Sequence, residues 1–221
     1  MLSILRQHPR KAIEFLIELF NHAANWYAHP RVTERLEPAF EVSITLPDGS
    51  AKTHWANERL WQLYRGTSVG PHVLQSYLMA LERWLRDLAK LQPDMFDSIL
   101  VELLSRTDCA SIAAVVAGAA TAFPFQAGEA ILCLLSAREY IALDRARMVA
   151  DFSPPSQVLG GMLNVSQQQL FRDERNQADK WPSRRDDLEA AVRNLQMTPF
   201  APRVQSRLDE LRAALGPVRC V

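Results

Sequence analysis

The fold is decided by the stretch from residue 71 to residue 91, which reads PHVLQSYLMALERWLRDLAKL. Its large apolar residues recur at steps of three and four, the spacing that places side chains on one face of an α-helix. The members of this stripe are Val73, Leu74, Tyr77, Leu78, Leu81, Trp84, Leu85 and Leu88. Glu82 and Arg86 lie on the other side, at the spacing where opposite charges pair on a helix. The stretch therefore predicts a long amphipathic helix that buries a broad apolar face against its neighbours.

Further helices are predicted on the C-terminal side of this stretch, separated by short breaks. Apolar periodicity and capping residues indicate helices over residues 95–104, 112–123, 129–135 and 137–149. Consecutive helices joined by short connections pack as antiparallel neighbours. The predicted fold class is therefore mainly α, with stacked helical hairpins that form a HEAT or armadillo-like α-solenoid. This prediction depends on helix lengths and loops, because the sequence holds no strict repeat.

On the N-terminal side, a helix predicted over residues 9–27 precedes a segment in which the apolar period changes to two. Apolar and polar residues alternate over residues 40–46, and Pro47, Asp48 and Gly49 then favour a tight turn. In the second strand, the residues expected on the apolar face are Ala51, Thr53 and Trp55, and those on the polar face are Lys52 and His54. The pattern predicts a β-hairpin at about 40–55, which must lie against helices because two strands alone are marginally stable.

The chain is expected to divide near residue 153. Ser153, Pro154 and Pro155, followed by Gly160 and Gly161, break any continuous helix, and the sequence becomes more polar after them. Residues 1–152 are therefore predicted to form the helical-repeat domain that carries the hairpin, and residues 153–221 a more polar helical C-terminal extension.

The amino-acid composition makes some classes of binding partner less expected than others. Lys plus Arg equals Asp plus Glu, at 25 each, so no net field draws in nucleic acid or an anionic membrane. The three cysteines, Cys109, Cys133 and Cys220, are too few for a disulfide framework and too scattered for a zinc site, which favours buried thiols in a reducing cytoplasm. The apolar run over residues 112–135 is interrupted by Pro124 and Glu129, so a buried helical hairpin is favoured over a membrane segment.

The loop before the quoted helix is the first candidate site. Backbone N–H groups at the start of a helix attract anions, so this loop is a possible anion or ligand site. Its members are Arg65, Gly66, Thr67, Ser68, Gly70 and His72. The loop lacks the Gly-Lys-Ser/Thr ending of a P-loop, and a tight turn in which Thr67 or Ser68 caps the helix is the ordinary alternative. No cofactor and no catalytic residue is predicted.

Histidines give no convincing metal site or catalytic triad. His22 and His29 are two helical turns apart and share a face with Glu18, but zinc-binding histidine pairs on helices favour a spacing of one turn. His54 and His72 have no evident Ser or Cys partner in the sequence. No metal ligand set is therefore predicted.

Two clusters of mixed charge near the C-terminus form the second candidate site. They place Arg172 and Arg175 beside acidic residues, and likewise Arg184 and Arg185, which suits an exposed surface and a protein partner better than binding to a nucleic-acid duplex. A further group over residues 144–151, which contains Asp144, Arg145, Arg147 and Asp151, is interpreted as ion pairs on a helix, exposed or between repeats.

Two stretches carry a resemblance to a known family. Residues 61–69, WQLYRGTSV, with the leucine-rich helix that follows, and residues 172–175, RDER, leading to SRRDDLE at 183–189, resemble the helical region of very large bacterial ATP-binding proteins. Those proteins are similar to the STAND-type ATPases of antiphage defence. The resemblance covers residues 55–196 and implies a helical-repeat region that senses or scaffolds. It implies no ATP hydrolysis, because the chain has no Walker A sequence, and it carries over no functional residue.

Three functions follow from these patterns as hypotheses. The first is a non-catalytic helical-repeat scaffold or sensing module for protein–protein interaction, within or beside a bacterial antiphage ATPase. The second is a small cytoplasmic enzyme with a site near residues 66–70 that uses Arg65, His72 or His54. The third is a peripheral, membrane-associated helical protein that meets the bilayer through residues 112–135.

Overall fold

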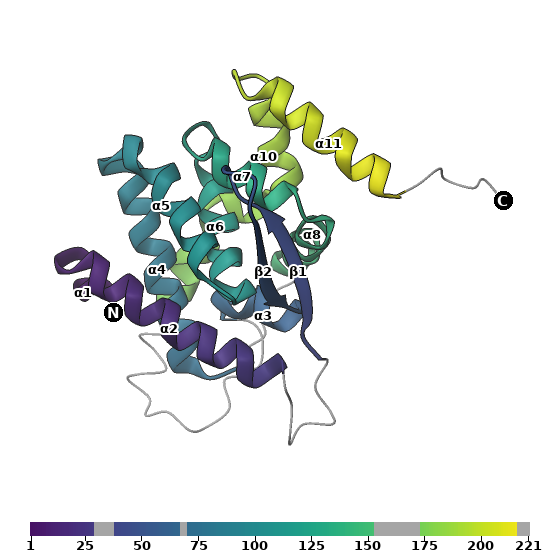
Figure 1. Cartoon of the computed structure of the whole chain (residues 1–221). Helices are drawn as coiled ribbons and strands as arrows, with labels where there is room; N and C mark the ends of the chain where they lie inside the picture. The colour runs from purple at the N-terminus through teal and green to yellow at the C-terminus, as the bar shows by residue number, and fades with distance from the viewer. Residues whose placement is uncertain (29–37, 67–69, 153–172, 216–221) are drawn as a thin grey trace.

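The computed structural model of the chain describes residues 1–28, 38–66, 70–152 and 173–215. It is mainly helical with one sheet of two antiparallel strands, so the predicted mainly α class with one β-hairpin is confirmed (Figure 1). The first elements are α1 (Leu2–Gln7), α2 (Pro9–Ala28), β1 (Phe40–Thr45), β2 (Ala51–Ala56), α3 (Glu58–Gln62), η1 (Leu63–Arg65), α4 (His72–Leu91) and α5 (Pro93–Arg106). The later elements are α6 (Ala110–Ala122), η2 (Pro124–Gln126), α7 (Gly128–Leu135), α8 (Arg138–Asp151), η3 (Pro182–Arg185), α10 (Leu188–Leu195) and α11 (Ala201–Leu215). Residues 173–179 form a further helix.

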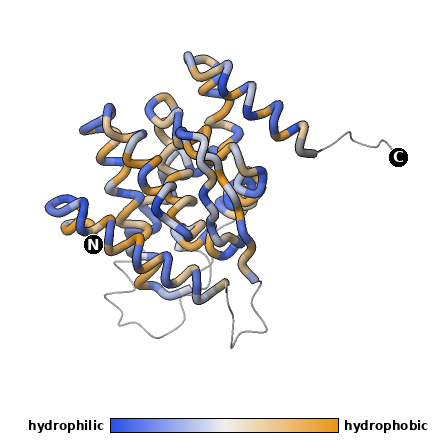
Figure 2. The backbone as a smooth tube through the Cα atoms, viewed as in Figure 1, coloured by the Kyte–Doolittle hydropathy of each residue, from blue (hydrophilic) through white to orange (hydrophobic). Residues whose placement is uncertain are grey.

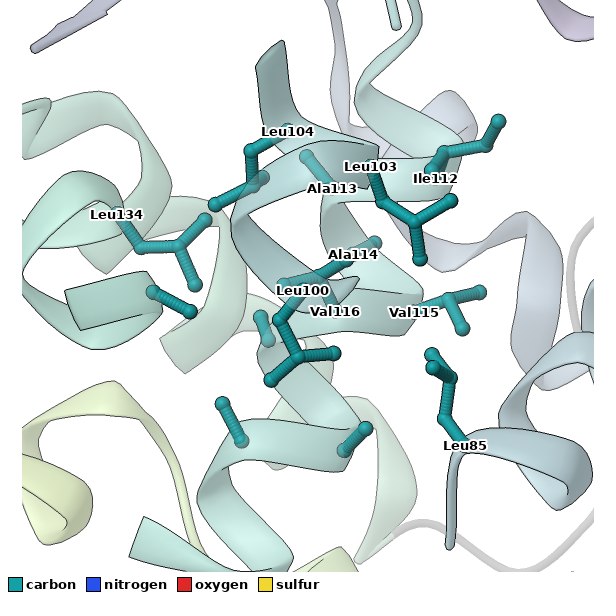
Figure 3. Close-up of a cluster of buried hydrophobic side chains, with 14 of the residues drawn as sticks. Leu85, Leu100, Leu103, Leu104, Ile112, Ala113, Ala114, Val115, Val116 and Leu134 are labelled. Carbon is teal, nitrogen blue, oxygen red and sulfur yellow. The ribbon is translucent and has the colours of Figure 1, made fainter. Parts of the chain in front are cut away.

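Helix α6 lies at the centre of the molecule and is buried along almost its whole length. Its small side chains, such as Ala113 and Ala114, let the surrounding helices approach closely. Figure 3 shows this packing, in which Leu85 of α4, Leu100 of α5 and Leu134 of α7 surround the helix. Figure 2 shows apolar and polar residues alternating along the helices. None of the helices in the described ranges has the length and apolar character needed to cross a membrane.

The contacts of α6 differ from those expected in an α-solenoid. In a linear stack of helical hairpins, each repeat contacts only its neighbours. Helix α6 instead contacts α2, α3, α4, α5, α7 and α10, which come from both ends of the chain. These contacts do not confirm stacking of the HEAT type.

Helix α4 has the predicted amphipathic pattern, and Leu78, Leu81 and Leu85 of its stripe are fully buried. The opposite face differs from the expectation. Glu82 is also buried, and its partner is Arg184 at 2.6 Å instead of Arg86. The reason is that residues 173–185 cover this face of the helix, as shown by the contacts of Glu82 and of Arg83, which reaches Gln177.

The hairpin turn forms as predicted. Gly49 has a φ of 85°, and its N–H donates to the carbonyl of Leu46 at 2.9 Å. The N–H of Leu46 in turn donates to the carbonyl of Ser50 at 2.8 Å, which closes a three-residue loop with glycine in the left-handed conformation. This loop sets the register of β1 against β2.

The register corrects the predicted faces of β2. Val42 and Ile44 are the buried residues of β1, and they pair with His54 and Lys52. Directly paired residues of antiparallel strands point to the same face, so His54 is turned into the core while Trp55 lies on the other face, half-buried. The alternation within β2 alone favoured Trp55, but the turn geometry and the stronger apolar pattern of β1 decide the register.

The segments on both sides of the expected boundary at residue 153 share one hydrophobic core. Leu188, Ala191 and Leu195 of α10 belong to the same buried cluster as α6, and α10 contacts α6, α7 and α8. The boundary itself falls in residues 153–172, outside the described residues. Helix α11 extends from the body (Figure 1), and its residue Val204 is buried.

Candidate functional site

A mostly buried set of charged side chains lies between several helices, and we call it the arginine cluster. It holds four guanidinium groups and four carboxylates from α4, η1, α8, residues 173–179 and η3. Its members are Arg65, Arg147, Arg175, Arg184, Glu82, Asp144, Asp151 and Asp179. The opposite charges balance, as burial of ionic groups requires.

Arg147 is the most completely bound member. Helical spacing brings its guanidinium to Asp144 at 3.0 Å and to Asp151 at 3.2 Å, and two further N–H groups donate to the carbonyls of Arg184 and Asp186. Burial alone would lower the pKa of Arg147, but the nearby Tyr64 and Asp144 more than offset this and the pKa is raised. The group is a permanent cation that holds η3 against α8.

Arg65 joins α8 to the helix of residues 173–179. Its Nε donates to both oxygens of Asp151, at 2.9 and 3.1 Å, and its Nη2 donates to Asp179 at 2.7 Å. Gly66 follows with a φ of 66° and ends η1, and its carbonyl accepts a long hydrogen bond of 3.4 Å from Nη1 of Arg175. The turn of Arg65 and Gly66 therefore lies directly against the C-terminal part of the chain.

Arg184 is held by charge and by aromatic rings. Its Nη2 donates to Glu82 at 2.6 Å, and its guanidinium lies 4.9 Å from the ring centre of Trp181. Arg86 lies 4.0 Å from the same ring, so two cations share one indole. This arrangement fixes η3 on α4.

The residues of the predicted anion loop have different surroundings in the structure. Arg65 lies in the arginine cluster, where its donors face carboxylates of this chain, and Gly66 contacts Arg175. Gly70 packs on the side chain of Leu63, and His72 begins α4. The other predicted members, Thr67 and Ser68, lie outside the described residues. The structure brings Arg65 and Gly66 together with Arg175, which the sequence had assigned to a separate site.

The predicted partner surface is corrected at two of its four positions. Arg175 and Arg184 are buried and contact this chain, because residues 173–185 pack over α4 and α8. Arg184 donates to Glu82 of α4, whereas Arg175 donates to the carbonyl of Gly66 and lies 4.0 Å from Asp179 of its own helix. Arg185 is exposed as predicted, and Arg172 lies outside the described residues. The group on α8 is likewise buried in part, since Asp144 and Arg147 lie inside the protein.

His54 forms a second buried polar arrangement beside the cluster. Burial lowers its pKa to about 4, so the ring is neutral at physiological pH. Its Nε2 lies 2.9 Å from the carbonyl of Leu104, which can only accept, and its Nδ1 therefore accepts from the hydroxyl of Tyr140 at 2.5 Å. Tyr140 packs on Trp61, with ring centres 4.7 Å apart, and Trp61 donates to Asp144 at 3.4 Å. This chain of contacts links the hairpin to α8.

Two other kinds of site find no support in the described residues. No group of three or more His, Cys, Asp or Glu side chains there is placed to hold a metal ion. Burial raises the pKa of Cys109, and it raises that of Cys133 to about 12, so both are thiols and not thiolates at neutral pH. His29 and Cys220 lie outside the described residues.

Cavities occur beside the arginine cluster and at α11. One of about 100 Å³ lies between α4 and residues 174–181, and its lining includes Glu82 and Trp181. Another of about 210 Å³ lies between α7 and α11. Neither is lined by Arg65, His54 or His72, the residues of the hypothetical enzyme site.

Four large apolar side chains are exposed at one end of the molecule, on a surface that we call the turn surface. Leu91 and Met95 flank the α4–α5 turn, Phe125 lies in η2, and Met197 follows α10; they are 52 to 85% exposed. The three turns lie at the same end in Figure 1. Contacts between elements agree, because η2 contacts both α5 and α10. Nothing in the sequence periodicity marked these residues, because each lies in or beside a turn and not on the apolar stripe of a helix.

Comparison with known proteins assigns no function, so a functional proposal must be based on the geometry of this chain. No protein-family model matches the chain, and no curated protein matches it significantly.

Proposed function

We propose that this chain is a non-catalytic helical module that binds another protein through the turn surface. The observation that carries the proposal is the gathering of Leu91, Met95, Phe125 and Met197 on turns at one end of the molecule. Isolated exposed apolar residues are ordinary, but several together on one surface are typical of protein interfaces. Phe and Met are also enriched in the centres of such interfaces.

The polar side chains are engaged within the chain, which also supports a non-catalytic function. Arg65, Arg147 and Arg184 have carboxylate partners within the chain. His54 is buried and neutral, and both of its ring nitrogens have partners in the core. Groups engaged in this way stabilise a fold and are poorly available to a substrate. A site near residues 66–70 that uses Arg65 or His54 is therefore a weaker proposal.

The wider setting of the proposal comes from the family resemblance. A helical-repeat region of the HEAT type, cytoplasmic and bacterial, which scaffolds or senses for an antiphage ATPase, is a function in which a non-catalytic helical module binds a protein. The helical hairpins α4–α5 and α6–α7 are the units that such a region would supply. A protein partner is thus part of the proposal, and a nucleic-acid partner is not.

Site-specific photo-crosslinking in the native host tests the proposal. Benzoylphenylalanine in place of Phe125 should give a discrete crosslinked adduct with a protein, and the same group in place of the exposed Gln205 of α11 is the control. Adding Leu91→Ser and Met197→Ser should remove the adduct with little change in unfolding, because both side chains are largely exposed. Adducts no stronger at Phe125 than at Gln205, or adducts that survive the two serines, would overturn the proposal.

A further inference from the structure

Arg175 is the one guanidinium of the arginine cluster that is buried without a close carboxylate partner. The residue is 6% exposed. Its Nη1 donates to the carbonyl of Gly66 at 3.4 Å. In the part of the chain that the structure describes, its Nε and Nη2 have no hydrogen-bond partner. Buried donors are nearly always paired, so two unpaired nitrogens on one cation indicate a missing partner.

The identity of the two nitrogens defines the chemistry of that partner. Nε and Nη2 lie on the same edge of the guanidinium plane, and their N–H groups point in parallel. This edge matches two oxygens of a carboxylate or phosphate group, the bidentate geometry that distinguishes Arg from Lys. Nη1, the nitrogen outside this edge, is the one bound to Gly66. The contact with Gly66 therefore orients this edge, and among the described residues it leaves the two donors there unpaired.

Asp179 is the carboxylate that lies within 4.0 Å of Arg175 in the described part of the chain, and it does not fill this role. Its Oδ2 lies 4.0 Å from Nε of Arg175, beyond hydrogen-bond distance, while its Oδ1 accepts from Arg65 at 2.7 Å. Arg65 is itself bound to Asp151 on its Nε side. The carboxylates near Arg175 are thus held by Arg65, and the charge of Arg175 is only partly compensated.

We propose that the Nε–Nη2 edge of Arg175, beside the turn of Arg65 and Gly66, binds an oxyanion, either a phosphate or a carboxylate group. Arg175 supplies two parallel donors, and Arg65 adds a second positive charge held in place by Asp151 and Asp179. The proposal is independent of the turn surface, which shares no residue with this site. A free phosphate compound and an acidic side chain of a partner protein present the same chemistry to this edge.

Titration of the full chain with simple anions tests the site. In ¹⁵N-labelled protein, the Nε–Hε signal of Arg175 is assigned by its loss in the Arg175→Lys variant. Inorganic phosphate or sodium acetate should shift this signal saturably, and sodium chloride of equal ionic strength should not. A response to phosphate alone indicates a phosphate compound as the natural ligand, and a response to both anions indicates a carboxylate. The Nε–Hε signal of the exposed Arg185 is the internal control.

Unfolding measurements give a second readout. Phosphate should raise the unfolding midpoint of the wild type and of Arg185→Gln more than chloride does. It should act at least about tenfold more weakly on Arg175→Lys, which keeps the charge but loses the parallel donors. A signal of Arg175 that neither anion moves, or equal stabilisation of Arg175→Gln and the wild type by phosphate, would overturn the proposal. If Arg175→Gln does not fold, the titration of the wild-type signal decides alone.

Discussion

Acid should destabilise this protein through His54 between pH 6.5 and pH 4. Burial is the main cause that lowers the pKa of His54 from 6.5 to about 4 in the folded chain. Above pH 6.5 the ring is neutral in both states. Below it, the unfolded chain takes up a proton that the folded chain refuses, so stability is lost as the pH falls from 6.5 to 4. A difference of this size corresponds to about 3 kcal/mol at pH 4 and about 2 kcal/mol at pH 5.

The assay is urea unfolding at several pH values for the wild type and for His54→Gln. Glutamine keeps an N–H near the position of Nε2, which donates to Leu104 at 2.9 Å, but it does not titrate. It should destabilise the protein at pH 7.5, because Tyr140 loses its ring-nitrogen acceptor. Between pH 7.5 and pH 4, the wild type should then lose about 3 kcal/mol more than the variant. The carboxylates titrate alike in both proteins and cancel in this difference.

A control and a clear refutation are available. The matched control is His22→Gln, the same substitution at an exposed position on α2. Parallel loss of stability by the wild type and His54→Gln from pH 6.5 to pH 4 would refute the reasoning, because it would mean that the folded protein does not hold His54 neutral.

Three further predictions follow from the packing. Gly128→Ala should destabilise the protein by about 1–3 kcal/mol, measured by urea unfolding, because the new Cβ would lie 2.4 Å from the ring of Phe200. Glu82→Ala should cost about 3–5 kcal/mol in the same assay, because it leaves the buried Arg184 without its carboxylate. Cys133 should not react with a thiol reagent at pH 8 until the protein unfolds, because burial raises its pKa to about 12.

Each of these predictions has its own control. Phe200→Ala removes the ring that Gly128→Ala would meet, so the double variant should lose less than the sum of the two single losses. Glu102→Ala breaks an exposed ion pair with Arg106 and should cost less than about 1 kcal/mol, so an equal cost for Glu82→Ala would contradict the role of burial. Cys133 is tested in a Cys220→Ser background, and rapid labelling of the folded protein would show that the thiol is accessible.

Local sequence patterns were sufficient for most of the helices and for the hairpin, although α1 was not predicted. The stripe on α4, the breaks between α5, α6 and α7, and the Pro-Asp-Gly turn are local signals, and each appears in the structure where the sequence placed it. Hydrogen bonds within one helix or one turn join residues a few positions apart, so a short window of sequence contains their cause. The preference for a buried helical hairpin over a membrane span at residues 112–135 was local as well, since Pro124 divides the apolar run into α6 and α7.

Only part of the candidate site could be predicted from local sequence patterns. Arg65 and Gly66 were identified from their loop, and Arg175 and Arg184 from their charge clusters, but the sequence could not show that they meet. Glu82 was expected to pair with Arg86 on the other side of the helix, because nothing within α4 reveals that another segment covers it. Exposed residues at the ends of helices, such as Phe125, carry no periodic signal at all.

What the sequence by itself determined is where most of the helices lie, where the hairpin turns, and which face of α4 is apolar. Only the tertiary structure decided that His54 faces the core and that Arg184 is buried with Glu82. The physical reason is that an ionic or polar side chain can be buried only where a partner compensates it. Here that partner is distant in the chain: Glu82 and Arg184 are 102 positions apart, and His54 and Tyr140 are 86 apart. A pattern within a short window of sequence cannot show that residues so far apart in the chain are partners.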